Sequence, residues 1–526
     1  MPTSELLRSR ATFVGTLLVG IVFVIARILL LRDVRDPWID EAMLTANLPV
    51  ATVGMLFRPL PLFAQAAPIG YLLPANILAA AFPAQETLAL RWLATLASMI
   101  AALSMVGALR ELGLRRLTPV VIAAAFLSVL GLRYAVETKH YGFEIMAGAL
   151  LLWGAARLTE RRDIASALCF GLAGLVAVAT SFTMPIVFAA LCAGFAVSEW
   201  RRGSLATDRF PLIAGAIAAA IVGVAFMVSY ILLVRPTTAY QMASYGELYR
   251  MKMLLPPVSV DSIKRWLRLP LIIADMVSPA IFLRWERVMA AVIAVPLISA
   301  GVLWLWRRAP ALAVTVPVSL AIVCLLSLAG TLPIGEPRHL LVLLPLVSIA
   351  AAAGVAMIVD RWAPDSTWIE PAFAILFAVV GTVQAIRSVP HEQVSPLYAL
   401  YRAEAHGEPL WAFAWSQPAM HEIAPAQPLI APLPERSSLR AWDADVMRPE
   451  AFETNGGQLN ADYVAKFGPL AAAHGPMWAI FSHYLSTRNL ERMLAASKAN
   501  GVRCVRRGQQ GSALLFRCDR DRSTTK

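Results

Sequence analysis

Residues 11–41 read ATFVGTLLVGIVFVIARILLLRDVRDPWIDE. An apolar run from Ala11 to Leu31, interrupted only by Arg27, is followed closely by the adjacent carboxylates Asp40 and Glu41. About 20 apolar residues are enough for a helix to cross a bilayer. Carboxylates so close to lipid are costly unless they have a task. The stretch therefore predicts a membrane-spanning helix with a candidate site just beyond its end.

The composition extends this pattern to most of the chain. Of 526 residues, 58% are hydrophobic and only 15% are charged, and the mean hydropathy is +0.64. Soluble proteins carry about 25% charged residues. Apolar runs recur to about residue 388, so residues 1–388 predict a mostly α, polytopic membrane module of about eleven spans. The net charge of +12 does not indicate a nucleic-acid partner, because the arginines cluster in short segments between apolar runs.

These basic clusters also orient the predicted spans. Cytoplasmic loops are enriched in Lys and Arg, which places the N-terminus inside as an uncleaved signal anchor. The external loops are then about 32–86, 133–141, 235–287 and 335–339. The segments 67–82 and 267–283 are too short or too interrupted for full spans and are expected to lie in the interface or to re-enter the membrane.

An odd number of spans places residues 389–526 outside the cytoplasm. Their strand and helix patterns alternate and predict a small α/β domain. It ends in a predicted hairpin with arms Val502 to Arg507 and Ala513 to Cys518. Cys504 and Cys518 lie in the two arms, and outside the cytoplasm a disulfide between them is plausible. Two unpaired thiols are the alternative.

The polar groups of the external loops admit two readings. A carboxylate such as Asp40 can accept a proton from an acceptor group, and cations such as Lys139 or Arg338 can stabilise a leaving phosphate. Asp40 and Glu41 could also hold a divalent cation, Mg²⁺ or Mn²⁺. The structural alternatives are a helix N-terminal charge pair at positions 40 and 41, headgroup contacts of the cations, and hydrogen-bonded structural histidines.

Five short motifs, in order along the chain, resemble those of the polytopic GT-C glycosyltransferases. The resemblance is strongest to the branch with protein O-mannosyltransferases and lipid A aminoarabinose transferases, glycosyltransferase family 39-like proteins. Each motif is weak alone, but the similarity, with the motifs in order and with matching topology, covers about residues 10–360. The motifs are WIDEA at 38–42, APIGYLL at 67–73, LRWL at 90–93, YAVETKHY at 134–141 and RHLL at 338–341.

The resemblance implies a GT-C membrane fold with an active site on the periplasmic face of a bacterial inner membrane. It implies a polyprenyl-phosphate sugar donor and a periplasmic glycoconjugate or protein acceptor. The family's catalytic carboxylate falls on Asp40 with Glu41 beside it, and a second acidic site falls on Glu137. The residues that would contact the donor phosphate are Arg338, Lys139 and His339.

The function expected on these grounds is an inverting glycosyltransferase acting on a lipid, glycan or protein. Two alternatives stay open: a transporter or flippase of a lipid-linked sugar, and a non-catalytic envelope assembly protein. Transporters commonly show repeated halves and ionisable residues at midspan. The sequence shows neither feature clearly, and a shared fold does not guarantee a shared activity.

Overall fold

The computed structural model describes residues 3–32, 36–49, 51–58, 60, 65–203, 209–236, 238–239, 249–279, 284–387, 393–413, 416–424, 426–430, 461–482 and 487–520. The chain forms two compact units. The first comprises Met1–Asp33, Ala67–Arg235 and Lys252–Ser388, and the second comprises Val34–Ala66, Pro236–Met251 and Val389–Lys526. The second unit therefore combines the expected C-terminal domain with parts of two loops predicted to be external.

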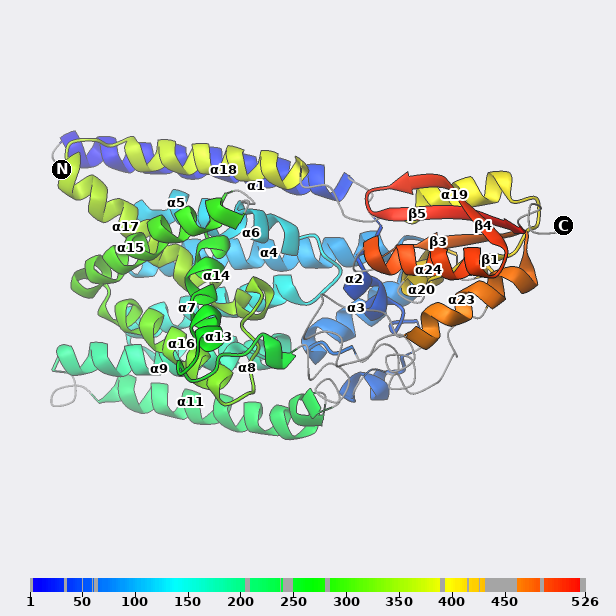
Figure 1. Cartoon of the computed structure of the whole chain (residues 1–526). Helices are drawn as coiled ribbons and strands as arrows, with labels where there is room; N and C mark the ends of the chain where they lie inside the picture. The colour runs from blue at the N-terminus through cyan, green and yellow to red at the C-terminus, as the bar shows by residue number, and fades with distance from the viewer. Residues whose placement is uncertain are drawn as a thin grey trace. The chain divides into compact units, whose positions relative to one another are not determined.

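The described residues of the first unit are mostly helical, and most of the helices run side by side (Figure 1). The α-helices are α1 (Thr3–Arg32), α3 (Ile69–Ala81), α4 (Glu86–Glu111), α5 (Thr118–Phe126), α6 (Val129–Tyr134), α7 (Tyr141–Arg161), α8 (Ile164–Thr180), α9 (Met184–Arg201), α11 (Phe210–Ser229), α13 (Val260–Trp266), α14 (Arg268–Met276), α15 (Arg284–Arg308), α16 (Pro310–Leu328), α17 (Leu344–Trp362) and α18 (Ile369–Arg387). Short 3₁₀ or π turns are η2 (Pro83–Gln85), η3 (Arg115–Leu117), η4 (Tyr230–Val234) and η5 (Pro337–Leu343).

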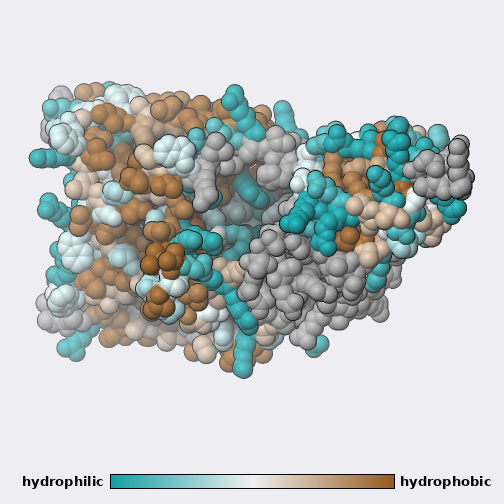
Figure 2. Space-filling model, in the orientation of Figure 1, coloured by the Kyte–Doolittle hydropathy of each residue, from teal (hydrophilic) through white to brown (hydrophobic). Residues whose placement is uncertain are grey.

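Eight helices among the described residues are long and apolar enough to cross a bilayer. The other three predicted spans correspond to α5 with α6, to α7 and to α8, which are shorter or more polar. The face of these helices that Figure 2 shows is largely hydrophobic, as a lipid-facing surface requires. The chain is thus a multi-pass membrane protein, as its composition indicates.

The third predicted span, 118–132, is not one continuous helix. It ends as α5 at Phe126 and restarts as α6, where the Ser128 hydroxyl accepts a hydrogen bond of 3.1 Å from the Gly131 N–H. Arg27 of α1 explains the break, because it is 3% exposed and its Nη2 donates to the Phe126 carbonyl oxygen at 3.0 Å. The charge that interrupts the first apolar run therefore satisfies a carbonyl at the end of α5.

The two segments predicted to lie in the interface or to re-enter each contain a short helix. The 13 residues of α3 span about 20 Å, which is less than the hydrocarbon thickness. The 9 residues of α14 span even less. Neither helix crosses a bilayer alone, which agrees with the expectation from their length and prolines.

The second unit contains a five-stranded mixed sheet of order β2-β1-β3-β5-β4. Strand β1 is parallel to β2 and β3, whereas β5 is antiparallel to β3 and β4. The α/β prediction for the C-terminal region is confirmed (Figure 1). The elements are α2 (Ile39–Thr45), η1 (Val53–Phe57), α19 (Ser395–Glu404), β1 (Leu410–Ala412), α20 (Gln417–Ile423), β2 (Leu429–Ile430), α23 (Ala461–His474), β3 (Met477–Phe481), α24 (Thr487–Ala499), β4 (Val502–Gln510) and β5 (Ala513–Arg520).

The central strand β3 is buried on both faces because helices cover both sides of the sheet. Successive side chains of a strand point to opposite faces. Met477 and Phe481 join one core cluster with residues of α23 and α24, and Trp478 and Ile480 join another with residues of α19 and α20. All five residues of β3 are accordingly buried.

The closing hairpin holds the two cysteines of the C-terminal region. Cys504 of β4 and Cys518 of β5 are directly opposite in the register of the antiparallel pair. They form a disulfide, with the Sγ atoms 2.05 Å apart. The bond closes a loop that the strand pairing already orders, and such cross-links typically contribute about 2–4 kcal/mol to folding.

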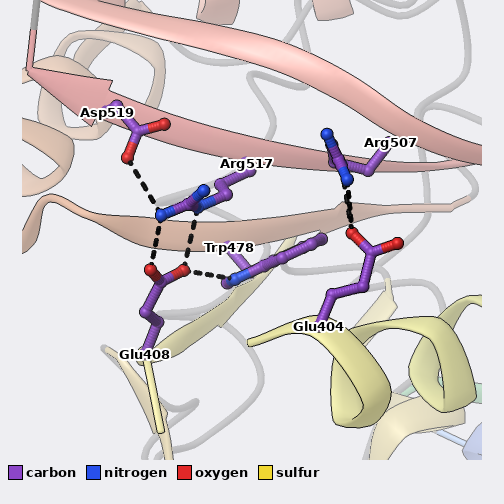
Figure 3. Close-up of polar contacts among 6 residues, drawn as sticks. All are labelled: Glu404, Glu408, Trp478, Arg507, Arg517 and Asp519. Carbon is purple, nitrogen blue, oxygen red and sulfur yellow. Dashed lines mark hydrogen bonds and ion pairs between the residues drawn. The ribbon is translucent and has the colours of Figure 1, made fainter. Parts of the chain in front are cut away.

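Two ion pairs connect the segment around α19 to the sheet (Figure 3). Glu408 accepts from Arg517 through both carboxylate oxygens, at 3.0 and 2.6 Å, and from the indole Nε1 of Trp478 at 2.6 Å. Glu404 accepts a hydrogen bond from Arg507 at 2.7 Å. Both side chains are more than a third exposed, Glu404 at 35% and Arg507 at 45%. The Glu408–Arg517 pair therefore also contacts the buried Trp478 indole, whereas the Glu404–Arg507 pair lies on the surface.

Glu408→Ala is expected to destabilise the protein more than Glu404→Ala. The first substitution leaves the Trp478 indole N–H, on a side chain that is 1% exposed, without its acceptor, which costs about 1–3 kcal/mol. The second removes a solvent-exposed pair worth about 0.2–1 kcal/mol. Thermal unfolding of the full chain in detergent measures the difference, and equal melting temperatures for the two variants would contradict this account.

Candidate functional site

The predicted site residues fall in both units, and each group is described in its own unit. Asp40 and Glu41 belong to the second unit, in α2. The other predicted residues belong to the first unit and occupy the α6–α7 connection and η5: Glu137, Lys139, Arg338 and His339.

Asp40 and Glu41 lie in the first turn of α2 but differ in environment. Glu41 is 5% exposed, and its Oε2 accepts a hydrogen bond of 2.9 Å from the N–H of Trp38, the residue that precedes the helix. In this contact an acidic side chain in the first helical turn accepts the N–H of the residue before the helix, as in a capping box. Glu41 therefore stabilises the helix N-terminus. Asp40 is partly exposed. The adjacent carboxylates therefore have separate surroundings and need not share a task.

The described residues do not supply a metal-binding cluster. They contain no group of three or more His, Cys, Asp and Glu side chains that could hold an ion. One oxygen of Glu41 is already bonded to the Trp38 N–H.

The α6–α7 connection holds its charged side chains in a packed setting. Glu137 is 8% exposed and accepts a hydrogen bond of 2.6 Å from the Nε of Arg133. Lys139 is 6% exposed, and its Nζ lies 6.0 Å from the ring centre of Tyr141. The Tyr71 hydroxyl donates to the Thr138 carbonyl at 2.7 Å. These contacts hold the α6–α7 connection against Tyr71 of α3 and Tyr141 at the start of α7.

The two histidines of the predicted motifs are half-buried. Burial, assisted by the charge of Lys139, lowers the pKa of His140 to about 3, so its imidazole is neutral at physiological pH. Its ring packs against Tyr71, Tyr141 and Phe182. His140 is therefore a structural residue. The backbone N–H of His339 donates to the Glu336 carbonyl at 3.2 Å and forms part of the turn before α17.

Glu336 joins two cations from different segments of the first unit. Its carboxylate pairs with the Nζ of Lys252 and with the Nε of Arg338, the latter at 2.6 Å. The backbone holds the segments together, because the Ile334 N–H donates to the Lys252 carbonyl at 2.9 Å. Burial by itself raises the pKa of Glu336, but Arg338 and Lys252 outweigh it and hold that pKa below its usual value.

The close approach of these segments requires a glycine at position 335. A Cβ there would come within 2.7 Å of the Lys252 Cγ. Sequence reasoning did not single out Lys252 or Glu336 as site residues. The available signal was that both lie in loops predicted on the same side of the membrane.

Charged residues of the predicted motifs at 133–141 and 336–339 interact electrostatically with Tyr134. Burial raises the pKa of the Tyr134 phenol, and Glu137 reinforces the rise, whereas Arg133 and Arg338 oppose it. The phenol therefore stays protonated and can donate a hydrogen bond. We name this group the Tyr134 cluster; its members are Tyr134, Arg133, Glu137, Lys252, Glu336 and Arg338. Its three cations exceed its two carboxylates, so it carries net positive charge.

A buried carboxylate inside α7 was also missed by the sequence analysis. Glu144 is 4% exposed and accepts hydrogen bonds from the hydroxyls of Ser181 and Thr183, the latter at 2.6 Å. A carboxylate within a predicted span was the signal that could have found it. Its bonds join α7 to the connection between α8 and α9, which is a structural role.

Comparison with known proteins identifies the fold. No protein-family model matches the sequence, and no curated protein matches it significantly. Solved structures do match over nearly the whole chain, and the polytopic architecture described above is that of the GT-C glycosyltransferases. The chain therefore has the GT-C fold.

Two of the matching structures are of one protein, ArnT from Cupriavidus metallidurans. The apo structure matches with a TM-score of 0.55 at 14% identity, covering 96% of this chain and 98% of that one. The structure bound to undecaprenyl phosphate matches with a TM-score of 0.53 at 15% identity, covering 95% and 97%. An Archaeoglobus fulgidus oligosaccharyltransferase, solved with Zn and sulfate, scores 0.49 at 14% identity over 95% of this chain and 73% of that one.

Proposed function

We propose that this protein is an inverting glycosyltransferase that moves a sugar from a polyprenyl phosphate to an acceptor outside the cytoplasm. The observation that carries the proposal is the likeness, over nearly the whole length of both chains, to a protein solved with undecaprenyl phosphate. The net positive Tyr134 cluster in the helical unit supplies groups that suit a lipid phosphate.

In this proposal the Tyr134 cluster stabilises the leaving phosphate. Negative charge develops on the phosphate oxygen as the bond to the sugar breaks, and fixed cations in a water-poor site stabilise it most. Arg338 is the main contact, because its guanidinium presents several N–H groups in a planar fork. Lys139 and His339 are proposed to assist it from the neighbouring positions predicted by the sequence motifs.

Asp40 is proposed as the base. The acceptor oxygen or nitrogen attacks the anomeric carbon from the side opposite the phosphate, the carbon–oxygen bond to the phosphate breaks, and the acceptor proton passes to the Asp40 carboxylate. One displacement of this kind inverts the anomeric configuration. Glu41 supports the base indirectly, because it closes the first turn of α2. Glu137 is proposed to orient Arg133 beside Tyr134.

The proposed setting is a bacterial inner membrane, with the N-terminus in the cytoplasm and the second unit in the periplasm. A disulfide between Cys504 and Cys518 supports that orientation, since disulfides persist in oxidising compartments. The acceptor is proposed to be a lipid, a glycan or a protein exposed in that compartment.

Lipid and glycan mass spectrometry of a deletion strain tests this function. The expected result is one glycoconjugate that lacks one sugar, together with accumulation of the matching polyprenyl-phosphate sugar, both reversed by the wild-type gene. The purified protein should then release polyprenyl phosphate when donor and acceptor are supplied. A purified protein that moves the donor across a vesicle membrane without releasing polyprenyl phosphate would instead be a transporter.

A further inference from the structure

Helix α2, which carries Asp40, is held in place by the C-terminal part of the chain. It has only 7 residues, and helices this short are not stable in water without tertiary contacts. The sequence predicts the C-terminal domain at 389–526 as a separate module, yet α2 belongs to the same compact unit. The position of Asp40 therefore depends on contacts with residues more than 350 positions away.

The first of these contacts is apolar. Ile39 and Met43, four residues apart on one helical face, are 7% and 5% exposed. They belong to the core cluster that includes Trp411, Phe467 and Phe481. Ala42 is fully buried in the second cluster, on the other side of the sheet core. Three apolar residues of α2 near Asp40 are thus part of the domain core.

The second contact fixes the segment just before α2. The Asp36 carboxylate accepts the Ser395 N–H at 2.6 Å with one oxygen and the Ser395 hydroxyl at 2.5 Å with the other. Ser395 is the first residue of α19, whose preceding residue Val394 has no side chain that can cap the helix. Asp36 therefore caps α19 from a distant part of the chain. Its negative charge also interacts favourably with the positive end of the helix dipole.

The third contact fixes the end of α2. Thr45 is 2% exposed, and its hydroxyl donates to the Glu422 Oε2 of α20 at 2.9 Å. With the Asp36 contact at one end and the Thr45 contact at the other, α2 can neither slide along the domain nor rotate without breaking a partly buried hydrogen bond.

We propose that Asp36 is a positioning residue for Asp40, and that the C-terminal domain serves catalysis by holding the base through the Asp36–Ser395 contact. The inference rests on the proposed role of Asp40. It assigns the C-terminal domain a part in the chemical step, in addition to any part in acceptor choice. Displacing a catalytic group by about 1 Å can cost about 10²-fold in rate.

Steady-state kinetics of variants at this contact, in the full chain, test the proposal. Asp36→Ala removes both hydrogen bonds to Ser395 and is expected to lower kcat by about 10–100-fold while the KM for the polyprenyl-phosphate donor stays within about 2-fold. Ser395→Ala removes one bond and is expected to give a smaller loss of kcat. Ser395→Thr keeps the hydroxyl and is expected to retain most of the wild-type kcat.

The matched control is Arg507→Gln, which breaks the exposed pair that ties the last residue of α19, Glu404, to the sheet. It touches no residue of α2, so its kcat should stay near that of the wild type. Wild-type kcat in both Asp36→Ala and Ser395→Ala, with Asp40→Asn inactive, would overturn the positioning role and leave the proposed function intact. A matching loss in Arg507→Gln would also overturn it, because the effect would then be general destabilisation.

If Asp36→Ala does not fold, the comparison of Ser395→Ala with Ser395→Thr decides the same question. Equal kcat in these two variants overturns the proposal, and recovery by threonine supports it. Wild-type transfer by Asp40→Asn would instead contradict the assignment of Asp40 as the base. That failure of the proposed function is distinguishable from a failure of the positioning role, because it is measured without any variant at position 36 or 395.

Discussion

Asp40→Asn is expected to lower the rate of sugar transfer by about 10²–10⁴-fold, the range that a general base contributes. The amide is nearly isosteric with the carboxylate but cannot take the acceptor proton. Asp40 is partly exposed on α2, so the substitution should not disturb the packing of Ile39 and Met43. The measurement is release of polyprenyl phosphate from a defined donor, normalised to the amount of folded protein.

The neighbouring carboxylate provides the control for this prediction. Glu41→Gln keeps a side-chain oxygen that can accept the Trp38 N–H, so its transfer rate should fall by less than about 10-fold. Wild-type activity in Asp40→Asn would end the assignment of the base. An equal loss in both variants would show that the charge of the first turn matters and not Asp40 alone.

Arg338→Gln is expected to lower kcat by about 10²–10³-fold, the loss seen when one donor to a developing negative charge is removed. Binding of undecaprenyl phosphate should also weaken, because the Tyr134 cluster loses one of its three cations. Glu336 would keep only Lys252 as its partner. Transfer kinetics together with binding of radiolabelled undecaprenyl phosphate measure both effects.

The control for the loss of a positive charge is Arg161→Gln. Arg161 pairs with Glu111 at 2.6 Å, is 48% exposed, and lies in a loop predicted to face the cytoplasm. Its replacement should leave kcat and lipid binding within about 2-fold of wild type, since exposed pairs contribute little. If Arg338→Gln and Arg161→Gln have the same effect, phosphate stabilisation by Arg338 is wrong.

The membrane architecture could be predicted from apolar runs and basic clusters because both are local signals. The break in the third span could not, since it depends on Arg27 reaching the carbonyl of Phe126 from another helix. The hairpin with Cys504 and Cys518 was predictable, because two strand patterns flank a short turn. These cases separate what a local pattern determines from what a distant contact determines.

The candidate site was predictable only in part. The motifs at 133–141 and 336–339 were expected on one membrane face, and charged residues of both interact electrostatically with Tyr134. The pairing of Lys252 with Glu336 was not predictable, because it depends on a backbone contact between two loops. A carboxylate that caps a helix and one that does chemistry look alike in a sequence, so the contact of Glu41 with the Trp38 N–H could be recognised only in the structure. The role of Asp40 as the base stays a prediction.

A structure of this protein with undecaprenyl phosphate bound tests the central claim most directly. We predict that the phosphate oxygens lie about 3 Å from the Arg338 guanidinium, within the Tyr134 cluster. A phosphate bound elsewhere on the protein, with Arg338 still paired to Glu336, would contradict the account.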